Sequence, residues 1–318
     1  MKTYEPKPKF IERMRLLLDD EQDLKNFLET SKTQSKRSVR VNTLKMNPDE
    51  LKNRLEKKNW KIKQPFKNYQ EIFIIENELE PGELGKTKEH LLGYYYVQEI
   101  TSMMPILSLQ LDANNSFLDL CASPGSKTTQ AAAVMENKGT IIANDLTLNR
   151  ISIISSNLER CGVMNTIVTR HDGFELCSKL KKLPIVFDKI LIDAPCSGEG
   201  NIRTSNRTFL EWSEPLLKSL SRKQKRLVSL APFLLKKNGE IVYSTCTHSP
   251  EENEFIVQYL IDNFDLEIID INLPIKTRPG ILEWYDNKFH HSMKKAVRIY
   301  HHDNDLEGFF LCKMRKKR

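Results

Sequence analysis

The sequence predicts an α/β fold, a doubly wound and mostly parallel sheet with helices on both faces, preceded by a small α+β domain. From Phe117 onward, short β-rich runs alternate with helix-like segments, which is typical of parallel strands joined by crossover helices. Before about residue 100 the pattern is a mixture of helices, strands and turns. We therefore expect a small N-terminal α+β domain at 1–100 and a larger domain at 101–318.

The small domain is expected to begin with one or two amphipathic helices in residues 10–30, where apolar side chains recur at helical spacing. Residues 38–45 alternate like a strand, and Pro48 is expected to begin a helix that ends at about Lys58. Another strand is expected at 70–76. For Tyr94, Tyr95 and Tyr96 we favour a helix packed on the core over a stacking platform.

The larger domain is expected to contain five strands followed by helices, and a sixth that returns near the end. After the fifth strand, Ser249 is expected to cap a helix whose first residue is Pro250, with Glu252 as the reciprocal cap. Ligands of such sheets bind outside the carboxyl ends of the strands, so the residues that follow the strands are the site candidates. The expected strands are 117–120, 140–144, 166–169, 189–193, 240–244 and 308–314.

The net charge of +7 is unevenly distributed. Residues 1–69 hold 18 Lys and Arg against 10 Asp and Glu, whereas residues 70–110 hold 2 against 7, and the chain ends in a basic tail. Such patches favour a polyanion such as nucleic acid. A solvated charged face explains the charge equally well.

The six cysteines form no CxxC pair and no short His/Cys spacing, so we expect no metal. No apolar run approaches the roughly 20 residues that cross a bilayer. We therefore expect a cytoplasmic protein with reduced cysteines and no membrane partner.

The first expected strand is followed by the turn CASPGSKT, Cys121 to Thr128. Pro124 and Gly125 force a tight turn, and Ser126 begins a helix whose amino end favours negative charge. The turn has neither the GxGxxG of dinucleotide sites nor the GxxxxGK[ST] of P-loops. A ligand with a carboxylate therefore fits better than a pyrophosphate.

Acidic residues follow successive strands. Asp119 lies at the end of the first strand, Asp145 at the end of the second is placed to bind ribose hydroxyls, and Asp172 after the third could accept from an adenine amino group. Each alone is more often a cap or turn residue, but together they predict an adenosine-type ligand without a pyrophosphate, for which S-adenosyl-L-methionine is the natural candidate. The residues expected to contact this cofactor are Cys121, Ala122, Ser123, Pro124, Gly125, Ser126, Lys127, Asp145, Arg150, Asp172 and Asp193.

Two further strand ends each carry a cysteine, Cys196 and Cys246. A lone cysteine is usually a small buried hydrophobe, which is our expectation for Cys161, Cys177 and Cys312. Two thiols that follow two strands indicate covalent chemistry instead.

The segments DAPCSGEG (193–200), STCTHSPEEN (244–253) and CASPGSKT (121–128) resemble the Sun family of RNA cytosine-5 methyltransferases. The resemblance extends through RVNTLK (40–45), YYVQEITSMMP (95–105) and GFFLCKM (308–314). The family's first motif more often reads CAAPGGKT, so Ser123 and Ser126 are departures. The resemblance implies a Rossmann-like class I methyltransferase fold, S-adenosyl-L-methionine as methyl donor, and a monomer that acts on RNA, with tRNA favoured.

The resemblance also implies roles for four side chains. Cys246 is the nucleophile that adds to carbon 6 of cytosine, which makes carbon 5 able to accept a methyl group. Cys196 assists the breakdown of this adduct, Asp193 stabilises the base edge and Lys127 contacts the base. We expect His248 to be a turn residue rather than a base for Cys246. The expected RNA contacts are Arg37, Arg40 and Lys45 in the front segment and Arg203, Arg207 and Trp212 beyond the Cys196 loop.

Three alternatives stay open. The RNA could be ribosomal rather than transfer RNA. Methylation of a base amino group needs no cysteine at either strand end. A non-catalytic RNA-binding scaffold on the same fold would predict a damaged cofactor turn or the loss of Cys246, but both are intact in this sequence.

Overall fold

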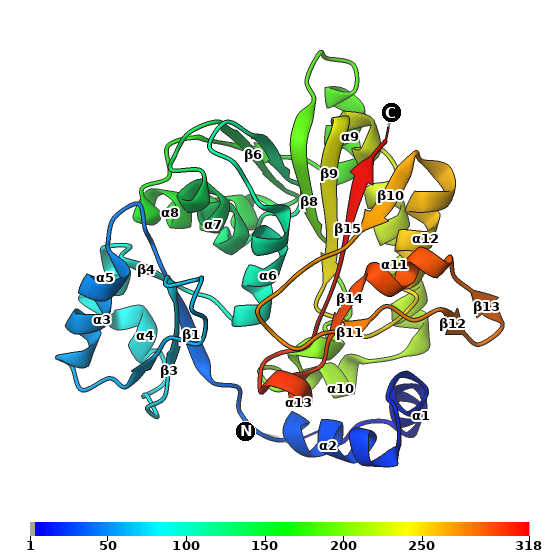
Figure 1. Ribbon diagram of the computed structural model, residues 1–318, viewed down its shortest axis with the longest axis horizontal. Coiled ribbons are helices and arrows are strands. Elements are labelled where there is room, and N and C mark those ends of the chain that lie inside the picture. Colours follow the sequence, from blue (N-terminus) through cyan, green and yellow to red (C-terminus); the bar gives the residue numbers. More distant parts are fainter. Residues whose placement is uncertain (1–3, 318) are drawn as a thin grey trace.

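The computed structural model describes residues 4–317. It contains a four-stranded sheet of order β2-β3-β1-β4 and a nine-stranded sheet, which lie side by side in Figure 1. Within the described range, none of the helices has the length and apolar character that a bilayer crossing requires.

The small sheet is antiparallel and buries both β1 and β3. Tyr95 and Tyr96 lie in strand β4, so the helix expected there is wrong, because β1 offers an edge with which these residues pair. The strand expected at 38–45 ends at Val41. The elements are β1 (Arg37–Val41), α3 (Pro48–Glu56), β2 (Ile62–Lys63), β3 (Ile72–Ile75), α4 (Glu83–Lys86), α5 (Lys88–Leu91) and β4 (Tyr95–Val97).

The two opening helices, α1 (Pro8–Leu17) and α2 (Glu21–Ser31), pack away from the small sheet. Asp20 caps α2 by accepting from the backbone N–H of Asp23. Their apolar side chains join a cluster with residues of the larger domain, and Figure 1 shows both helices beneath α10 (Arg207–Glu211) and α13 (His301–Asn304). That cluster contains Phe10, Met14, Leu18, Leu24, Phe27, Ile202, Phe209, Trp212, Leu217 and Tyr300.

The large sheet has the order β11-β14-β15-β9-β8-β5-β6-β7, with β10 paired to β15. Strands β7, β6, β5, β8 and β9 are parallel, so the predicted doubly wound sheet is confirmed. Its strands are β5 (Ser116–Asp119), β6 (Thr140–Asp145), β7 (Thr166–Arg170), β8 (Phe187–Asp193), β9 (Leu235–Thr245), β10 (Leu266–Ile269), β11 (Arg278–Pro279), β14 (Val297–Ile299) and β15 (Phe309–Lys316). A separate hairpin joins β12 (Glu283–Trp284) to β13 (Asn287–Lys288).

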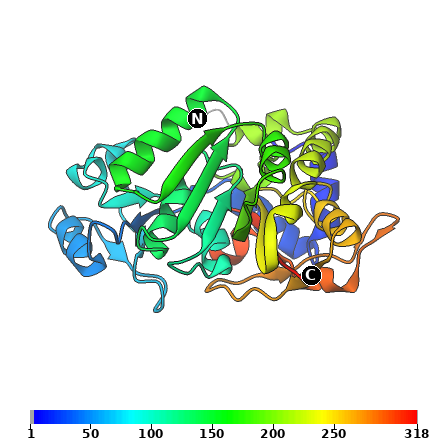
Figure 2. The ribbon, with the colours of Figure 1, turned by 90° about the horizontal axis from the view of Figure 1, so that it is seen from above.

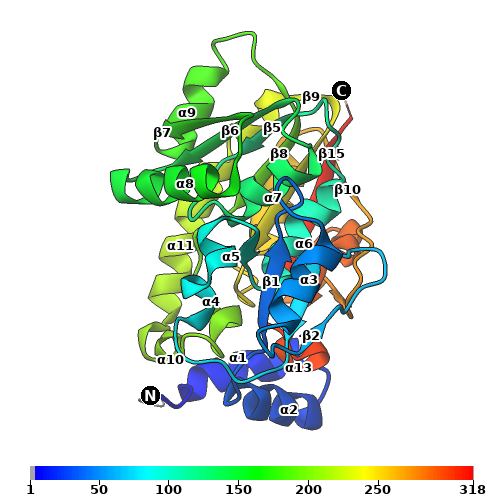
Figure 3. The ribbon, with the colours of Figure 1, turned by 90° about the vertical axis from the view of Figure 1, so that its left-hand side faces the viewer.

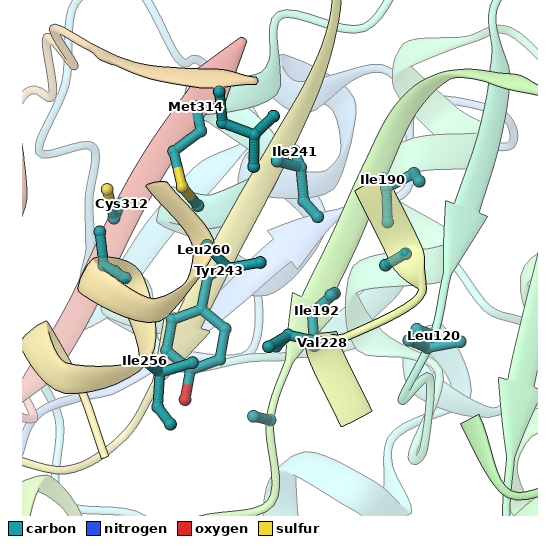
Figure 4. Packing of buried hydrophobic residues seen from close by; sticks show 14 of the residues in the cluster. Leu120, Ile190, Ile192, Val228, Ile241, Tyr243, Ile256, Leu260, Cys312 and Met314 are labelled. Atoms are coloured by element: carbon teal, nitrogen blue, oxygen red, sulfur yellow. The ribbon is translucent and has the colours of Figure 1, made fainter. Parts of the chain in front are cut away.

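Helices cover both faces of this sheet, as the view from above shows (Figure 2). Successive strand residues point to opposite faces: Val242 packs in the cluster that includes α6 and α7, while its neighbours Ile241 and Tyr243 pack in the cluster that includes α9, α11 and α12. Figure 4 shows Ile241 and Tyr243 among the side chains of the second cluster. The helices are α6 (Ile100–Leu109), α7 (Ser126–Val134), α8 (Leu148–Cys161), α9 (Gly173–Leu180), α11 (Glu214–Val228) and α12 (Glu254–Asn263).

The helix after β9 begins later than the sequence predicts. Residues 250–253 form turns, and α12 begins at Glu254. Ser249 and Glu252 therefore do not form the expected capping box. Instead, Glu252 accepts from the backbone N–H of Ser197 and from the side chain of Gln224.

Candidate active site

The two sulfur atoms of Cys196 and Cys246 lie 3.1 Å apart. Strands β8 and β9 are parallel and pair Asp193 with Ser244, so the loops that follow them leave the sheet at the same edge. The backbone N–H of Gly200 donates to the carbonyl of Cys246 at 2.9 Å and joins the two loops. The hydrogen bond from Cys246 and burial raise the pKa of Cys196 well above its usual value, so Cys196 keeps its proton at neutral pH.

A lysine pairs with the carboxylate that ends β8, three residues before Cys196. The ammonium of Lys127 is 2.7 Å from Oδ2 of Asp193 and donates to the hydroxyl of Ser102 at 2.9 Å. The hydroxyl of Ser244 donates to Oδ1 of Asp193 at 2.7 Å. The sequence arguments missed the two serines, because neither type signals a site by itself and their partners are far away in the chain.

A second carboxylate, Asp119, closes strand β5 at the same edge; it is the first of the three strand-end acids seen in the sequence, although it was not among the expected cofactor contacts. Its side chain is fully buried, and Oδ2 accepts from the hydroxyl of Thr128 at 2.6 Å. Oδ1 has no hydrogen-bond partner among the described residues, and burial raises the pKa of this carboxyl to about 7. An acid at the end of the first strand was the available signal.

The turn after β5 has the tight geometry that its sequence predicts. Gly125 has φ of +97°, a left-handed conformation that favours glycine, and its N–H donates to the carbonyl of Ala122. The backbone N–H of Ser123 donates to Asp145 at 3.0 Å. Helix α7 begins at Ser126, immediately after this turn.

Two cavities open on either side of the turn and share Cys121. The first, of about 560 Å³, is lined by Cys121, Asp145, Arg150 and Asp172, together with residues of α11. The second, of about 370 Å³, is lined by the other predicted residues Ala122, Ser123, Pro124, Ser126, Lys127 and Asp193, with Asp119 and Tyr96. Gly125 shapes the turn between them. Burial and nearby carboxylates raise the pKa of Cys121 well above its usual value, so its thiol is not a nucleophile.

Asp145 and Asp172, the two acids expected to bind ribose and adenine, already have partners within the protein. Asp145 accepts from two backbone N–H groups and lies 2.6 Å from the guanidinium of Arg150. Asp172 caps α9 through the N–H groups of residues 174 and 175 and pairs with Arg226 at 2.9 Å. The sequence predicted the position of both carboxylates but none of these partners.

The predicted RNA contacts are wrong for three residues, which are buried. Arg40 bonds to Gln98 and Thr129, Arg203 bonds to the segment at 33–34 and to Asp305, and the indole of Trp212 donates to Glu199. Lys45 donates to two backbone carbonyls. Among the predicted set, the exposed side chain of Arg207 pairs with Glu211 and is available at the surface.

His248 lies in the turn after β9, as predicted, but it is buried. Its ring stacks on Tyr300 with centroids 4.8 Å apart, and burial lowers its pKa well below the usual value. No hydrogen bond joins it to Cys246 in residues 4–317. In the same described range, no group of three or more His, Cys, Asp and Glu side chains could hold a metal ion.

Comparisons with known proteins agree with this geometry. Residues 106–315 match the family model described as 16S rRNA methyltransferase RsmB/F, and residues 7–100 match the N-terminal domain of 16S rRNA methyltransferase RsmF. A tRNA (cytosine(49)-C(5))-methyltransferase of Pyrococcus abyssi is 40% identical over 281 residues, which cover 88% of each chain.

A ribosomal RNA small subunit methyltransferase F of Erwinia tasmaniensis is 36% identical over 316 residues, which are 97% of this chain but 63% of that protein. The chain thus spans less than two thirds of this relative. A solved methyltransferase homolog from Pyrococcus horikoshii is similar with a TM-score of 0.83 and 33% identity, covering 96% of this chain and 93% of that one. The chain therefore belongs to the RsmB/F family, the Sun family of S-adenosylmethionine-dependent RNA cytosine-5 methyltransferases.

Proposed function

We propose that this chain methylates carbon 5 of a cytosine in transfer RNA, through a covalent bond between Cys246 and carbon 6 of the base. The observation that carries the proposal is the pair of thiols 3.1 Å apart on the loops that follow β8 and β9, with the Lys127–Asp193 ion pair at the end of β8. A nucleophile and a second proton-carrying group at one position suit a reaction that first forms a bond and later breaks it.

Cytosine carbon 5 is too weakly nucleophilic to take a methyl group unaided. When the sulfur of Cys246 adds to carbon 6, the electrons of the 5,6 double bond become available at carbon 5. Asp193 and Lys127 can stabilise the charge that moves into the ring, through ring nitrogen 3, the amino group or the carbonyl oxygen. Their mutual ion pair and the bonds to Ser102 and Ser244 hold both groups in place before the base arrives.

Release of the product reverses the first step. Solvent water takes the proton from carbon 5, the electron pair of the broken C–H bond restores the 5,6 double bond, and the bond between carbon 6 and the sulfur of Cys246 breaks. The thiol of Cys196 lies 3.1 Å from the sulfur of Cys246 and can give its proton to the departing thiolate as the bond breaks. This assigns the nucleophile to Cys246 and the release step to Cys196.

The cofactor residues fit S-adenosyl-L-methionine, which supplies the methyl group when bound. The cavity of about 560 Å³ has the size of a small-molecule site and carries Asp145 and Asp172 for hydroxyl and amino groups. Asp119, whose Oδ1 has no hydrogen-bond partner among the described residues, lines the second cavity, which shares Cys121 with the first. The carboxylate cluster suits a ligand that carries positive charge.

Transfer RNA is favoured because the relative named for tRNA aligns along 88% of its own length and of this chain. Ribosomal RNA is the second candidate, because relatives named for it align along nearly the whole of this chain. We place the reaction in the cytoplasm and expect a monomer.

The test is methylation of purified RNA. The enzyme, S-adenosylmethionine and unmodified tRNA or small-subunit rRNA are incubated, and 5-methylcytosine is located by bisulfite sequencing. We expect one protected cytosine in tRNA and none in rRNA. Protection only in rRNA would replace the substrate, and no protection in either RNA would contradict the proposed function.

A further inference from the structure

Helix α11 presents an exposed face that carries only positive charge. Between Pro215 and Val228 it has five Lys and Arg residues and no acid, and all five are exposed. They are Lys218, Arg222, Lys223, Lys225 and Arg226. With 100° per residue, Lys218, Arg222 and Arg226 form one row along the helix, with the other two on either side.

Two of these cations interact with neighbouring side chains of the protein, which accounts for their presence on the helix. Arg226 pairs with Asp172 and lies 4.6 Å over the ring of Phe174, and Lys225 lies 4.5 Å over the ring of Tyr259. Lys218 and Arg222 have no acidic partner within the described residues; Arg222 donates only to the carbonyl of Lys218. A protein gains little by placing unpaired like charges four residues apart on one helix, so this pair points to an external anion.

Another side of α11 is hydrogen-bonded to the two loops that follow β8 and β9 and carry Cys196 and Cys246. Gln224 donates to the carbonyl of Pro195, which precedes Cys196, at 2.9 Å, and Ser221 donates to the carbonyl of Glu251 at 2.6 Å. Lys223 lines the first cavity. A helix with side chains is about 10–12 Å wide, so the charged row lies roughly one helix diameter from the Cys196 loop. Figure 3 shows α11 along the edge of the molecule, from the level of α8 down to α10.

We propose that the exposed face of α11 binds the phosphates of the RNA strand next to the target cytosine. The inference rests on the proposed function, because a base that leaves its stack to reach Cys246 brings its flanking phosphates to this edge. Arg40 and Arg203 are buried and cannot contact RNA, and the cations of α11 would take their place. The alternative is that an acidic protein, and not RNA, binds this face of α11.

The test compares K218Q/R222Q with the control K182Q/K237Q. The control lysines are also exposed, but they lie before β8 and at the start of β9, at the edge of the sheet opposite the thiols. Glutamine has a helix propensity close to those of lysine and arginine, so K218Q/R222Q should fold. The control changes only exposed side chains of a turn and of the start of β9, so it should fold as well. Fluorescence anisotropy with labelled tRNA over a series of KCl concentrations gives the dissociation constant and its salt dependence.

We expect K218Q/R222Q to weaken tRNA binding about tenfold and to reduce the salt slope by about 1.4, the value for two phosphate contacts on a single strand. The control should match the wild type. Equal affinity and slope in both variants would overturn the inference and leave α11 to a protein partner. Methylation by the wild-type enzyme is measured separately, so a failure of the proposed function is recognised by its own readout.

Discussion

At the scale of single residues, the chemistry of this protein depends on groups whose environments differ although their types are the same. Cys196 and Cys246 are both partly accessible cysteines in contact with each other, whereas Cys177 and Cys312 are fully buried in the core. Among the carboxylates, Glu252 is likewise set apart by its environment. It contacts the Cys196 loop, where it accepts from the backbone N–H of Ser197, and it also accepts from the side-chain amide of Gln224. Its Oε1 has no partner in the described chain.

Glu252 should make stability depend on pH. Burial raises its pKa to about 7, above the usual value near 4.3. The folded state therefore holds this proton more tightly, and the stability that it contributes is complete below about pH 4 and is lost as the pH rises through about 7. We expect E252Q to lose less unfolding free energy between pH 5 and pH 8 than the wild type. Urea denaturation at both pH values measures this.

The exposed Glu267 on β10 provides the control. E267Q should keep the wild-type pH dependence. If E252Q and E267Q showed the same pH dependence as the wild type, Glu252 would have to be ionised in the folded protein.

At the scale of elements, the site is assembled where β8, β9 and β15 meet. Gly200 donates to the carbonyl of Cys246 and accepts from the N–H of Gly308, just before β15. The backbones at Gly200 and Gly308 approach so closely that a Cβ on Gly200 would collide with the carbonyl of Gly308. Glycine is thus required here by close packing of two loops.

Gly200→Ala should push the Cys196 loop away from Gly308 and thereby strain the hydrogen bond from Gly200 to the carbonyl of Cys246. We expect the methylation rate to fall at least about tenfold, and the free energy of unfolding to fall by about 1–3 kcal/mol, the usual cost of overpacking. Gly85→Ala is the matched control, since a Cβ there has no atom within 4 Å. Full activity of Gly200→Ala would show that the thiol geometry does not depend on this contact.

The elements also show what a sequence can predict. The strands were found because alternation and turn residues are local signals, and the carboxylates and thiols at their ends followed from the parallel arrangement. The fates of Arg40 and Arg203 could not be predicted, because their partners at Gln98 and Asp305 are distant in the chain. The sequence alone does not distinguish an arginine that binds RNA from an arginine buried in a hydrogen-bond network. The same limit applies to Glu252, whose expected capping role was wrong because its partners are Ser197 of the Cys196 loop and Gln224 of α11.

At the scale of the whole molecule, the N-terminal helices connect to the far end of the chain. Arg278 contacts both Asp23 of α2 and Asp303 of α13 at 2.5–2.7 Å, and its side chain is 15% exposed. The hydrogen bonds from Arg278 lower the pKa of Asp23 below its usual range. This stability is present at neutral pH and is lost as the pH falls through the pKa of the folded state.

Arg278→Gln should remove the guanidinium shared by two largely buried carboxylates and leave Asp303 with Lys276 and Asp23 with His302 as partners. We expect a loss of about 3 kcal/mol of unfolding free energy at pH 7, and a smaller loss at pH 4, where the carboxylates of the unfolded chain begin to take up protons. Arg54→Gln, which removes an exposed pair with Glu50, should cost much less, because a solvent-exposed ion pair is screened by water. Equal losses in the two variants, measured by urea denaturation, would show that the Arg278 network adds nothing beyond a surface pair.

The division of labour between the two thiols is tested most directly by trapping the protein–RNA adduct on a denaturing gel. Wild type, Cys246→Ala and Cys196→Ala are each incubated with S-adenosylmethionine and tRNA, and the shifted band is quantified. Cys246→Ala should give neither adduct nor methylated RNA. Cys196→Ala should accumulate the adduct, because the bond forms but is not released. An adduct in Cys246→Ala, or none in Cys196→Ala, would contradict the assignment.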